Sequence, residues 1–157
     1  MRKALPGAAE FVFTQREAVA CDAKSLAQVE RALMARPGFA IAVGSGTLGA
    51  LVKVAAHRRG VPYLVIATAP SMDGYLSANA GILMGGVKTP HYELAPAVAV
   101  IADTDILRTA PARMVQAGLG DALGKYTANA EWYLNAVLRG ERFCPAIWSF
   151  LEKELGA

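Results

Sequence analysis

The feature that most constrains the fold is an apolar run that ends in a glycine-rich turn and continues into a helical segment. Residues 39–43 are almost wholly apolar, as expected of a strand covered on both faces. Gly44-Ser45-Gly46-Thr47 follows directly, and the residues from there to about Arg59 have the pattern of a helix. Strand, turn and helix in this order form the repeating unit of parallel α/β proteins, so we predict an α/β fold.

Other segments repeat this alternation. They are strands at residues 11–13, 63–67 and 97–102 and a helix at residues 25–35. Residues 76–92 are harder to assign, and the Gly85-Gly86 pair suggests a hairpin or a turn between short elements. The first two thirds of the chain therefore predict an α/β domain built on a parallel sheet.

The character of the sequence changes after Asp103, where the pattern becomes helical. Pro111 is well placed as a first helical residue. Glycines predict breaks in the helices near residues 118–120 and at Gly140. We therefore divide the chain into an α/β domain at residues 1–105 and a helical domain that begins at residue 106 and runs to residue 157.

Composition excludes several classes of function. The chain has 157 residues and a net charge of +3, with Lys and Arg scattered rather than clustered, so no nucleic-acid surface is predicted. No apolar run reaches membrane-spanning length, and the N-terminus lacks the apolar stretch of a secretory signal. Cys21 and Cys144 are far apart, which favours reduced thiols. We expect a cytoplasmic protein without a membrane span.

The turn at residues 44–47, called the glycine turn below, has a chemical and a structural interpretation. A glycine-rich turn that opens a helix presents backbone N–H groups beside a positive helix end, which suits the pyrophosphate of a dinucleotide. Glycines also make ordinary tight turns, so the turn alone leaves both interpretations open. It differs from the Gly-x-Gly-x-x-Gly pattern because Ala50 lies beyond Gly49.

A second segment, Thr-Ala-Pro-Ser-Met-Asp-Gly at residues 68–74, follows the strand predicted at 63–67. We call it the 68–74 loop. Ligands of open α/β sheets collect at this edge, where Ser71 and Asp73 offer a hydroxyl and a carboxylate. The alternative is a plain turn, since Pro, Ser, Asp and Gly are common turn residues.

A third segment, residues 118–126, holds three glycines within a helical pattern. Each costs roughly 1 kcal/mol relative to alanine, a cost that often has a packing or ligand-access reason. Asp121 and Lys125 lie one helical turn apart and form an ion pair in the simplest interpretation. One carboxylate alone is poor evidence for a metal, because catalytic zinc takes three protein ligands.

Together these segments resemble successive motifs of the sn-glycerol-1-phosphate dehydrogenases. That group belongs to the superfamily of iron-containing alcohol dehydrogenases, glycerol dehydrogenases and dehydroquinate synthases. The matching motifs are the glycine turn with Lys53, the 68–74 loop, Ala102-Asp103-Thr104-Asp105, and residues 118–125. The resemblance covers the chain from about Phe39 onward; the 68–74 motif is specific to this branch, and the glycine turn is shared more widely.

The resemblance implies a fold, a reaction and a set of residues. The fold is a partial Rossmann-like parallel-sheet nucleotide-binding domain followed by the first helices of an all-α metal-binding domain. The reaction is NAD(P)H-dependent reduction of the small phosphate substrate dihydroxyacetone phosphate to sn-glycerol 1-phosphate, with a divalent metal, commonly Zn²⁺. The implied cofactor-binding residues are Gly44, Ser45, Gly46, Thr47, Thr68 and Ser71. Asp73 is implied as catalytic and substrate-binding, and Asp121 as substrate-binding and as the first metal ligand.

Three departures from the family pattern qualify this expectation. The family's Asp after the glycine turn is Ala50 here, two further His metal ligands are expected beyond Ala157, and the first βα unit is curtailed before Phe11. We therefore expect a chain that is incomplete at both ends and inactive alone. It then acts as a homo-oligomer or with a second chain that supplies the His ligands; the alternatives are a non-catalytic nucleotide-binding remnant and one half of a split enzyme.

Overall fold

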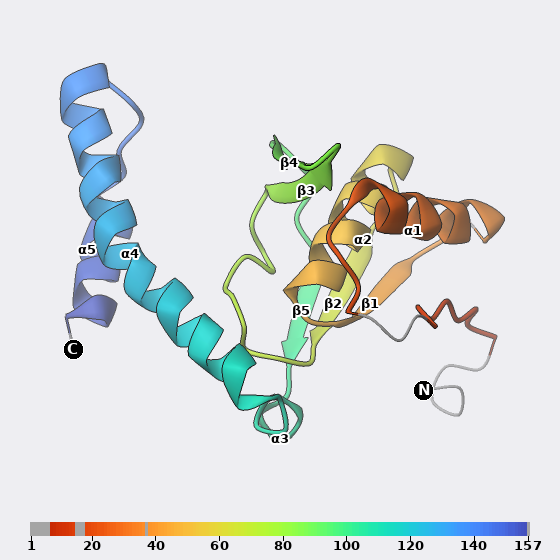
Figure 1. Ribbon diagram of the computed structural model, residues 1–157. Helices are drawn as coiled ribbons and strands as arrows, with labels where there is room; N and C mark the ends of the chain where they lie inside the picture. The colour runs from red at the N-terminus through yellow and green to blue at the C-terminus, as the bar shows by residue number, and fades with distance from the viewer. Residues whose placement is uncertain (1–6, 15–17, 37, 157) are drawn as a thin grey trace.

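The computed structural model describes residues 7–14, 18–36 and 38–156 of the chain. At its centre lies a three-stranded parallel sheet in the order β1-β2-β5 (Figure 1). The strands are β1 (Ala40–Gly44), β2 (Tyr63–Ala67) and β5 (Ala99–Ala102). All three were predicted as apolar runs, and the parallel α/β architecture is confirmed.

Helix α2 (Gly46–Arg59) packs on β1 and β2, and α1 (Ala23–Ala35) packs on α2. Side chains from Leu51 to Ala56 of α2 are buried almost completely, which explains why this helix is apolar on more than one face. Helix α1 is capped by Asp22, whose carboxylate accepts a hydrogen bond from the Ser25 N–H. Helix α2 stops at Gly60, whose φ of 63° is the left-handed conformation that glycine adopts without strain.

The segment that the sequence left ambiguous is an antiparallel hairpin of β3 (Ala80–Met84) and β4 (Val87–His91). Gly85 and Gly86 join the strands, with φ angles of 56° and 83°. Both positive angles are typical of a tight hairpin turn, which is why two glycines stand there. The Leu83 N–H donates to the Cys21 carbonyl at 2.7 Å, so the hairpin is attached to the chain just before α1.

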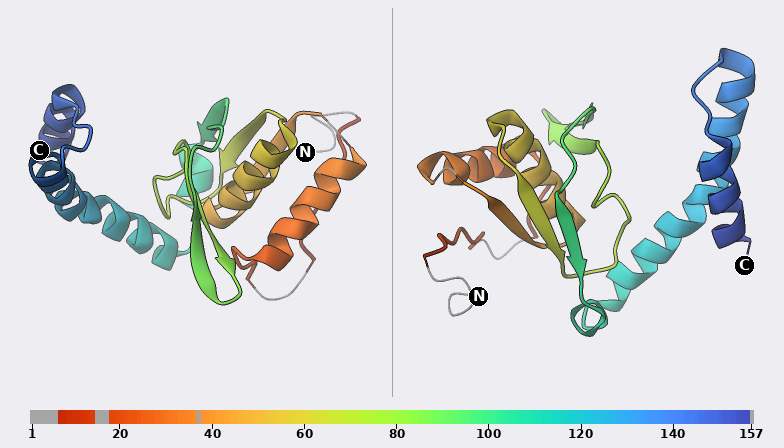
Figure 2. Two further views of the ribbon diagram at one scale, coloured as in Figure 1. Left: turned by 90° about the horizontal axis from the view of Figure 1, so that it is seen from above. Right: turned by 180° about the vertical axis from the view of Figure 1, so that it is seen from behind.

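The helical part consists of α3 (Thr104–Leu107), α4 (Ala112–Arg139) and α5 (Pro145–Leu155). Helix α4 runs away from the sheet, and α5 turns back along its far half (Figure 2). There the rings of Tyr133 and Trp148 lie 5.5 Å apart, and Phe143 contacts both. Among the described residues, none of the helices has the length and apolar character needed to cross a membrane.

Three sequence expectations were wrong in detail. Residues 11–13 form no strand; instead the Phe11 and Phe13 rings pack edge to face at 5.0 Å. Helix α4 continues through residues 118–120 without a break, because a helix of 28 residues tolerates the cost of internal glycines. Pro111 is the N-cap of α4 rather than its first helical residue, with a ψ of 138°. The predicted end at Gly140 is confirmed by its left-handed φ of 67°.

Burial of Tyr63 predicts a pH dependence. Its side chain is 1% exposed, and burial raises the pKa of Tyr63 from 10.0 to about 12. The unfolded chain loses this proton near pH 10 while the folded protein keeps it, so the stability from Tyr63 is present below pH 10 and is lost as the pH rises to about 12. The tyrosinate absorbance of the wild type minus that of Tyr63→Phe should rise near pH 12; a rise near pH 10 would contradict this burial.

Candidate functional site

Three of the predicted motifs meet at one edge of the sheet. Gly44, Ala67 and Ala102, the last residues of β1, β2 and β5, are aligned in register. The glycine turn, the 68–74 loop and the Asp103–Asp105 motif leave the sheet from these positions. The Thr68 N–H donates to the Gly44 carbonyl at 3.1 Å and ties the loop to the turn. Ligands of open α/β sheets bind at this edge.

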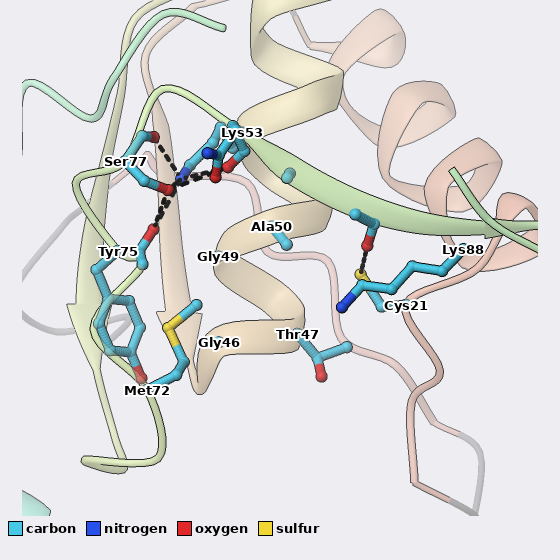
Figure 3. Close-up of a pocket in the computed structure, with 14 residues that line it drawn as sticks. Cys21, Gly46, Thr47, Gly49, Ala50, Lys53, Met72, Tyr75, Ser77 and Lys88 are labelled. Atoms are coloured by element: carbon cyan, nitrogen blue, oxygen red, sulfur yellow. Dashed lines mark hydrogen bonds between the residues drawn. The ribbon is translucent and has the colours of Figure 1, made fainter. Parts of the chain in front are cut away.

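A pocket of about 250 Å³ opens where α2 begins (Figure 3). Its walls come from the start of α2, the end of the 68–74 loop, the residues after that loop, and the β3–β4 hairpin with Cys21. The lining residues are Cys21, Gly46, Thr47, Gly49, Ala50, Lys53, Met72, Gly74, Tyr75, Ser77, Asn79, Ala80, Gly81 and Lys88. Segments far apart in the sequence therefore enclose one volume beside the glycine turn.

The start of α2 is suited to an anionic group. Ser45 is the N-cap of α2, but its side chain makes no capping hydrogen bond. The structure describes every residue of the first turn of α2, and none of them is acidic. The basic residues His57, Arg58 and Arg59 lie in the last turn, where they complement the helix dipole. The first N–H groups of α2 therefore remain available to a ligand.

Glycine at position 46 permits a close contact with the 68–74 loop. A Cβ atom there would lie 2.7 Å from Cγ of Met72, closer than side-chain carbons approach. Tyr75 follows the loop directly and is hydrogen-bonded back to its start, because the Tyr75 hydroxyl donates to the Ala69 carbonyl at 2.7 Å. Its ring lies against Gly49, 3.6 Å from where a Cβ would stand. Met72 and Tyr75 thus form a pocket wall that packs against the start of α2.

Lys53 fixes a further part of the wall. The residue is 2% exposed, and its ammonium donates to the carbonyls of Gly74 at 2.8 Å, Ser77 at 2.6 Å and Asn79 at 3.2 Å. It also contacts the Ser77 hydroxyl at 3.0 Å. Burial lowers the pKa of Lys53, and these acceptors offset part of the cost of burying the charge. The sequence analysis predicted no contact for Lys53, although a single lysine within the apolar run 51–56 is a signal that could have indicated its burial.

Helix α4 docks on the outer side of the 68–74 loop. A Cβ on Gly118 would lie 1.8 Å from the Pro70 carbonyl oxygen, so only glycine fits there. The Asp73 N–H donates to Oδ2 of Asp121 at 3.0 Å. Nζ of Lys125 lies 3.0 Å from Oδ2 of Asp73 and 4.0 Å from Oδ2 of Asp121. The hydrogen bond to Asp73 raises the pKa of Lys125.

The structure separates the predicted site residues into two groups. Gly46 and Thr47 line the pocket, and Gly44 and Ser45 complete the turn beside it. Asp73 and Asp121 meet at the contact with α4 instead. Two residues of the loop, Thr68 and Ser71, are not among the pocket's lining residues. Burial raises the pKa of the Tyr75 phenol, and the nearby Ser71 side chain offsets a smaller part of that shift.

Sequence reasoning gave no role to several residues of the pocket wall. They are Cys21, Tyr75, Ser77, Asn79, Ala80, Gly81 and Lys88. The Cys21 thiol donates to the Gly81 carbonyl at 3.4 Å across 60 residues of sequence, and burial raises the pKa of the thiol. No local pattern in the sequence indicates a contact of that range.

The donors around Asp121 do not form a metal site in the described part of the chain. No group of three or more His, Cys, Asp or Glu residues gathers there. The Asp121 carboxylate accepts the Asp73 N–H and lies beside the Lys125 ammonium, and a cation is a poor neighbour for a metal ion. Because catalytic zinc takes three protein ligands, this set does not fit one.

Comparison with known proteins gives one consistent set of relatives. The family model of the iron-containing alcohol dehydrogenases matches residues 5–111. A Bacillus subtilis (strain 168) protein named glycerol-1-phosphate dehydrogenase [NAD(P)+] is 45% identical over 117 residues, which make up 74% of this chain and 29% of that protein.

Solved structures agree with this assignment. A probable glycerol dehydrogenase from Sinorhizobium meliloti 1021 matches with a TM-score of 0.66 and 26% sequence identity. The match covers 73% of this chain and 34% of the glycerol dehydrogenase chain. A 2-deoxy-scyllo-inosose synthase, solved in complex with carbaglucose-6-phosphate, NAD+ and Co²⁺, matches with a TM-score of 0.55 and 27% sequence identity. The match covers 64% of this chain and 30% of the synthase chain. The matched region makes up 26% of the length of a Bacillus licheniformis relative and 36% of that of a Bacillus velezensis relative, both named glycerol-1-phosphate dehydrogenase [NAD(P)+].

Proposed function

The chain belongs to the iron-containing alcohol dehydrogenase family, and we propose that it supplies the nucleotide-binding part of an NAD(P)H-dependent reduction of dihydroxyacetone phosphate to sn-glycerol 1-phosphate. The observation that carries the proposal is the pocket beside the glycine turn. It opens at the free N–H groups of α2, at the carboxyl edge of a parallel sheet. A volume of about 250 Å³ suits part of a dinucleotide rather than a whole one.

The proposed roles follow from these positions. The N–H groups of Gly46 and Thr47 hold the pyrophosphate, with Gly44 and Ser45 shaping the turn. Thr68 and Ser71 lie on the loop that faces the nicotinamide half, and the exposed Asp73 carboxylate faces the phosphate substrate. When bound, the reduced nicotinamide supplies the hydride, while the chain binds and orients it.

A metal ion is part of the reaction that the resemblance implies, and the synthase structure named above contains Co²⁺. Asp121 is the residue of this chain that would be a ligand of Zn²⁺ and contact the substrate. Because the described donors around it do not fit a catalytic metal, we derive no step through one. This misfit favours a second candidate function, nucleotide binding without turnover by this chain alone.

Assembly and location belong to the same proposal. Large apolar side chains of α4 and α5 are exposed, among them Leu119, Leu134, Val137 and Phe150. Their exposure supports assembly, either as a homo-oligomer or with a second chain that supplies His ligands. We propose a cytoplasmic location, in keeping with reduced cysteines.

Calorimetric titration of the purified chain with NADPH and NADH tests the nucleotide site. We expect saturable binding to the wild type. Ala50 lines the pocket, so Ala50→Leu should weaken binding by about tenfold or more, which corresponds to about 1.4 kcal/mol. Ala128→Leu, on the exposed surface of α4, is the matched control and should bind like the wild type. Absence of saturable binding up to millimolar nucleotide would contradict the proposal.

A further inference from the structure

Two helices meet the 68–74 loop from opposite sides. On its inner side Met72 lies against Gly46 and Tyr75 lies against Gly49, both at the start of α2. On its outer side the Pro70 carbonyl and Asp73 contact α4. Figure 1 shows the loop passing beside the first turns of α4, and Figure 3 shows Met72 and Tyr75 on the pocket side.

The outer contacts fix the loop at two points three residues apart. At the first, the backbone of Pro70 approaches Gly118 so closely that a side chain at position 118 would collide with it. At the second, the Asp73 N–H donates to Asp121 at 3.0 Å, and the Asp73 carboxylate pairs with Lys125 at 3.0 Å. Hydrogen bonds to a carboxylate are about twice as strong as neutral ones. Met72 lies between the two points, so its position depends on both.

We propose that Gly118 and Asp121 are positioning residues, which hold the 68–74 loop so that Met72 and Tyr75 form the wall of the nucleotide pocket. This inference rests on the proposed nucleotide site and adds a coupling between the helical part and that site. The role of Asp121 in it needs no metal: its carboxylate accepts a backbone N–H from the loop. Displacement of α4 then opens the pocket wall without changing any residue that lines it.

Of the two contacts between the loop and α4, the one at Gly118 is the more sensitive to substitution. The Lys125 side chain is 34% exposed and that of Asp73 62%, and ion pairs this exposed contribute little to stability because water screens them. An added methyl group on Gly118 cannot be accommodated at 1.8 Å from a backbone oxygen, so the helix or the loop must move. Gly120 and Gly124 of the same helix have no atom within 4 Å of their Cβ positions and provide matched controls.

The test compares Gly118→Ala with Gly120→Ala in buffer that contains a chelator and no substrate. We expect Gly118→Ala to speed hydrogen exchange at the Asp73 amide by roughly tenfold or more, the factor for one lost hydrogen bond to a charged group. It should also shift the ¹³C-methyl resonance of Met72, assigned with Met72→Leu, and weaken NADPH binding by a similar factor. Gly120→Ala should leave all three unchanged.

If Gly118→Ala does not fold, Asp121→Ala provides the same test. This substitution removes the carboxylate that accepts the Asp73 N–H, and it adds no atom that could collide with the loop. It should produce the same three changes. If the wild type bound no NADPH, the proposed function would fail, while amide exchange and the Met72 resonance would still test the positioning role. Wild-type exchange at Asp73 and an unshifted Met72 methyl in both variants would overturn the inference.

Discussion

Lys53→Met should destabilise the protein by about 3 kcal/mol, as measured by urea unfolding. The substitution keeps the buried aliphatic stem but removes the donor to the carbonyls of Gly74, Ser77 and Asn79. The Ser77 hydroxyl lies 2.8 Å from the Gly74 carbonyl and 3.1 Å from the Asn79 carbonyl, so it still serves one of them. Two carbonyls lose their partner, at a cost of about 1–3 kcal/mol each.

Lys24→Met is the control, because Lys24 lies exposed on α1 and loses the same charge. It should change the free energy of unfolding by less than about 0.5 kcal/mol. Lys53→Met should also weaken nucleotide binding, since Gly74 and Ser77 line the pocket. A Lys53→Met variant as stable as Lys24→Met would show that the residues after the 68–74 loop do not depend on this ammonium.

The second large effect is expected for Ile82→Ala, at about 2–5 kcal/mol. Ile82 lies in β3, is 0% exposed and belongs to the main core. Truncation leaves a cavity between the hairpin and the helices that pack against β3, so the hairpin loses its anchor. Because Ala80, Gly81 and Lys88 of the hairpin line the pocket, the same variant should bind nucleotide more weakly.

Leu83→Ala is the matched control for this position. Leu83 is the next residue of β3 and is 44% exposed, because neighbouring residues of a strand point to opposite faces. Its backbone bond to Cys21 is unaffected by the substitution. We expect a change well below that of Ile82→Ala in thermal or urea unfolding. An equal loss of unfolding free energy in the two variants would contradict the packing of the hairpin described above.

The architecture around the glycine turn could be predicted from local pattern. Residues 40–44 are apolar throughout and end at glycines, so the strand, the turn and the start of α2 follow from neighbouring residues alone. The hairpin was left ambiguous because residues 76–92 have weak alternation; its pairing depends on the positive φ angles of Gly85 and Gly86. The strand expected at residues 11–13 was wrong, since a short apolar run does not specify a partner.

The site was predictable only in part, for a physical reason. The glycine turn and the 68–74 loop were found because each is continuous in sequence and follows a strand. Cys21 and Lys88 reach the pocket only through tertiary packing of the hairpin. Asp73 and Asp121 were treated as separate features, one in a turn and one in an ion pair with Lys125. The structure joins all three residues, although Asp73 and Asp121 are 48 residues apart in sequence.

The central claim is that a nicotinamide dinucleotide binds beside the glycine turn, and an amide NMR titration of the whole chain with NADPH tests it most directly. The account predicts saturable shifts at the amides of Gly46, Thr47 and Gly49 and at Tyr75, which surround the pocket. It also predicts that Ala50→Leu weakens these shifts while Ala128→Leu does not. Saturable shifts confined to α4 and α5, or none at any of these amides, would contradict it.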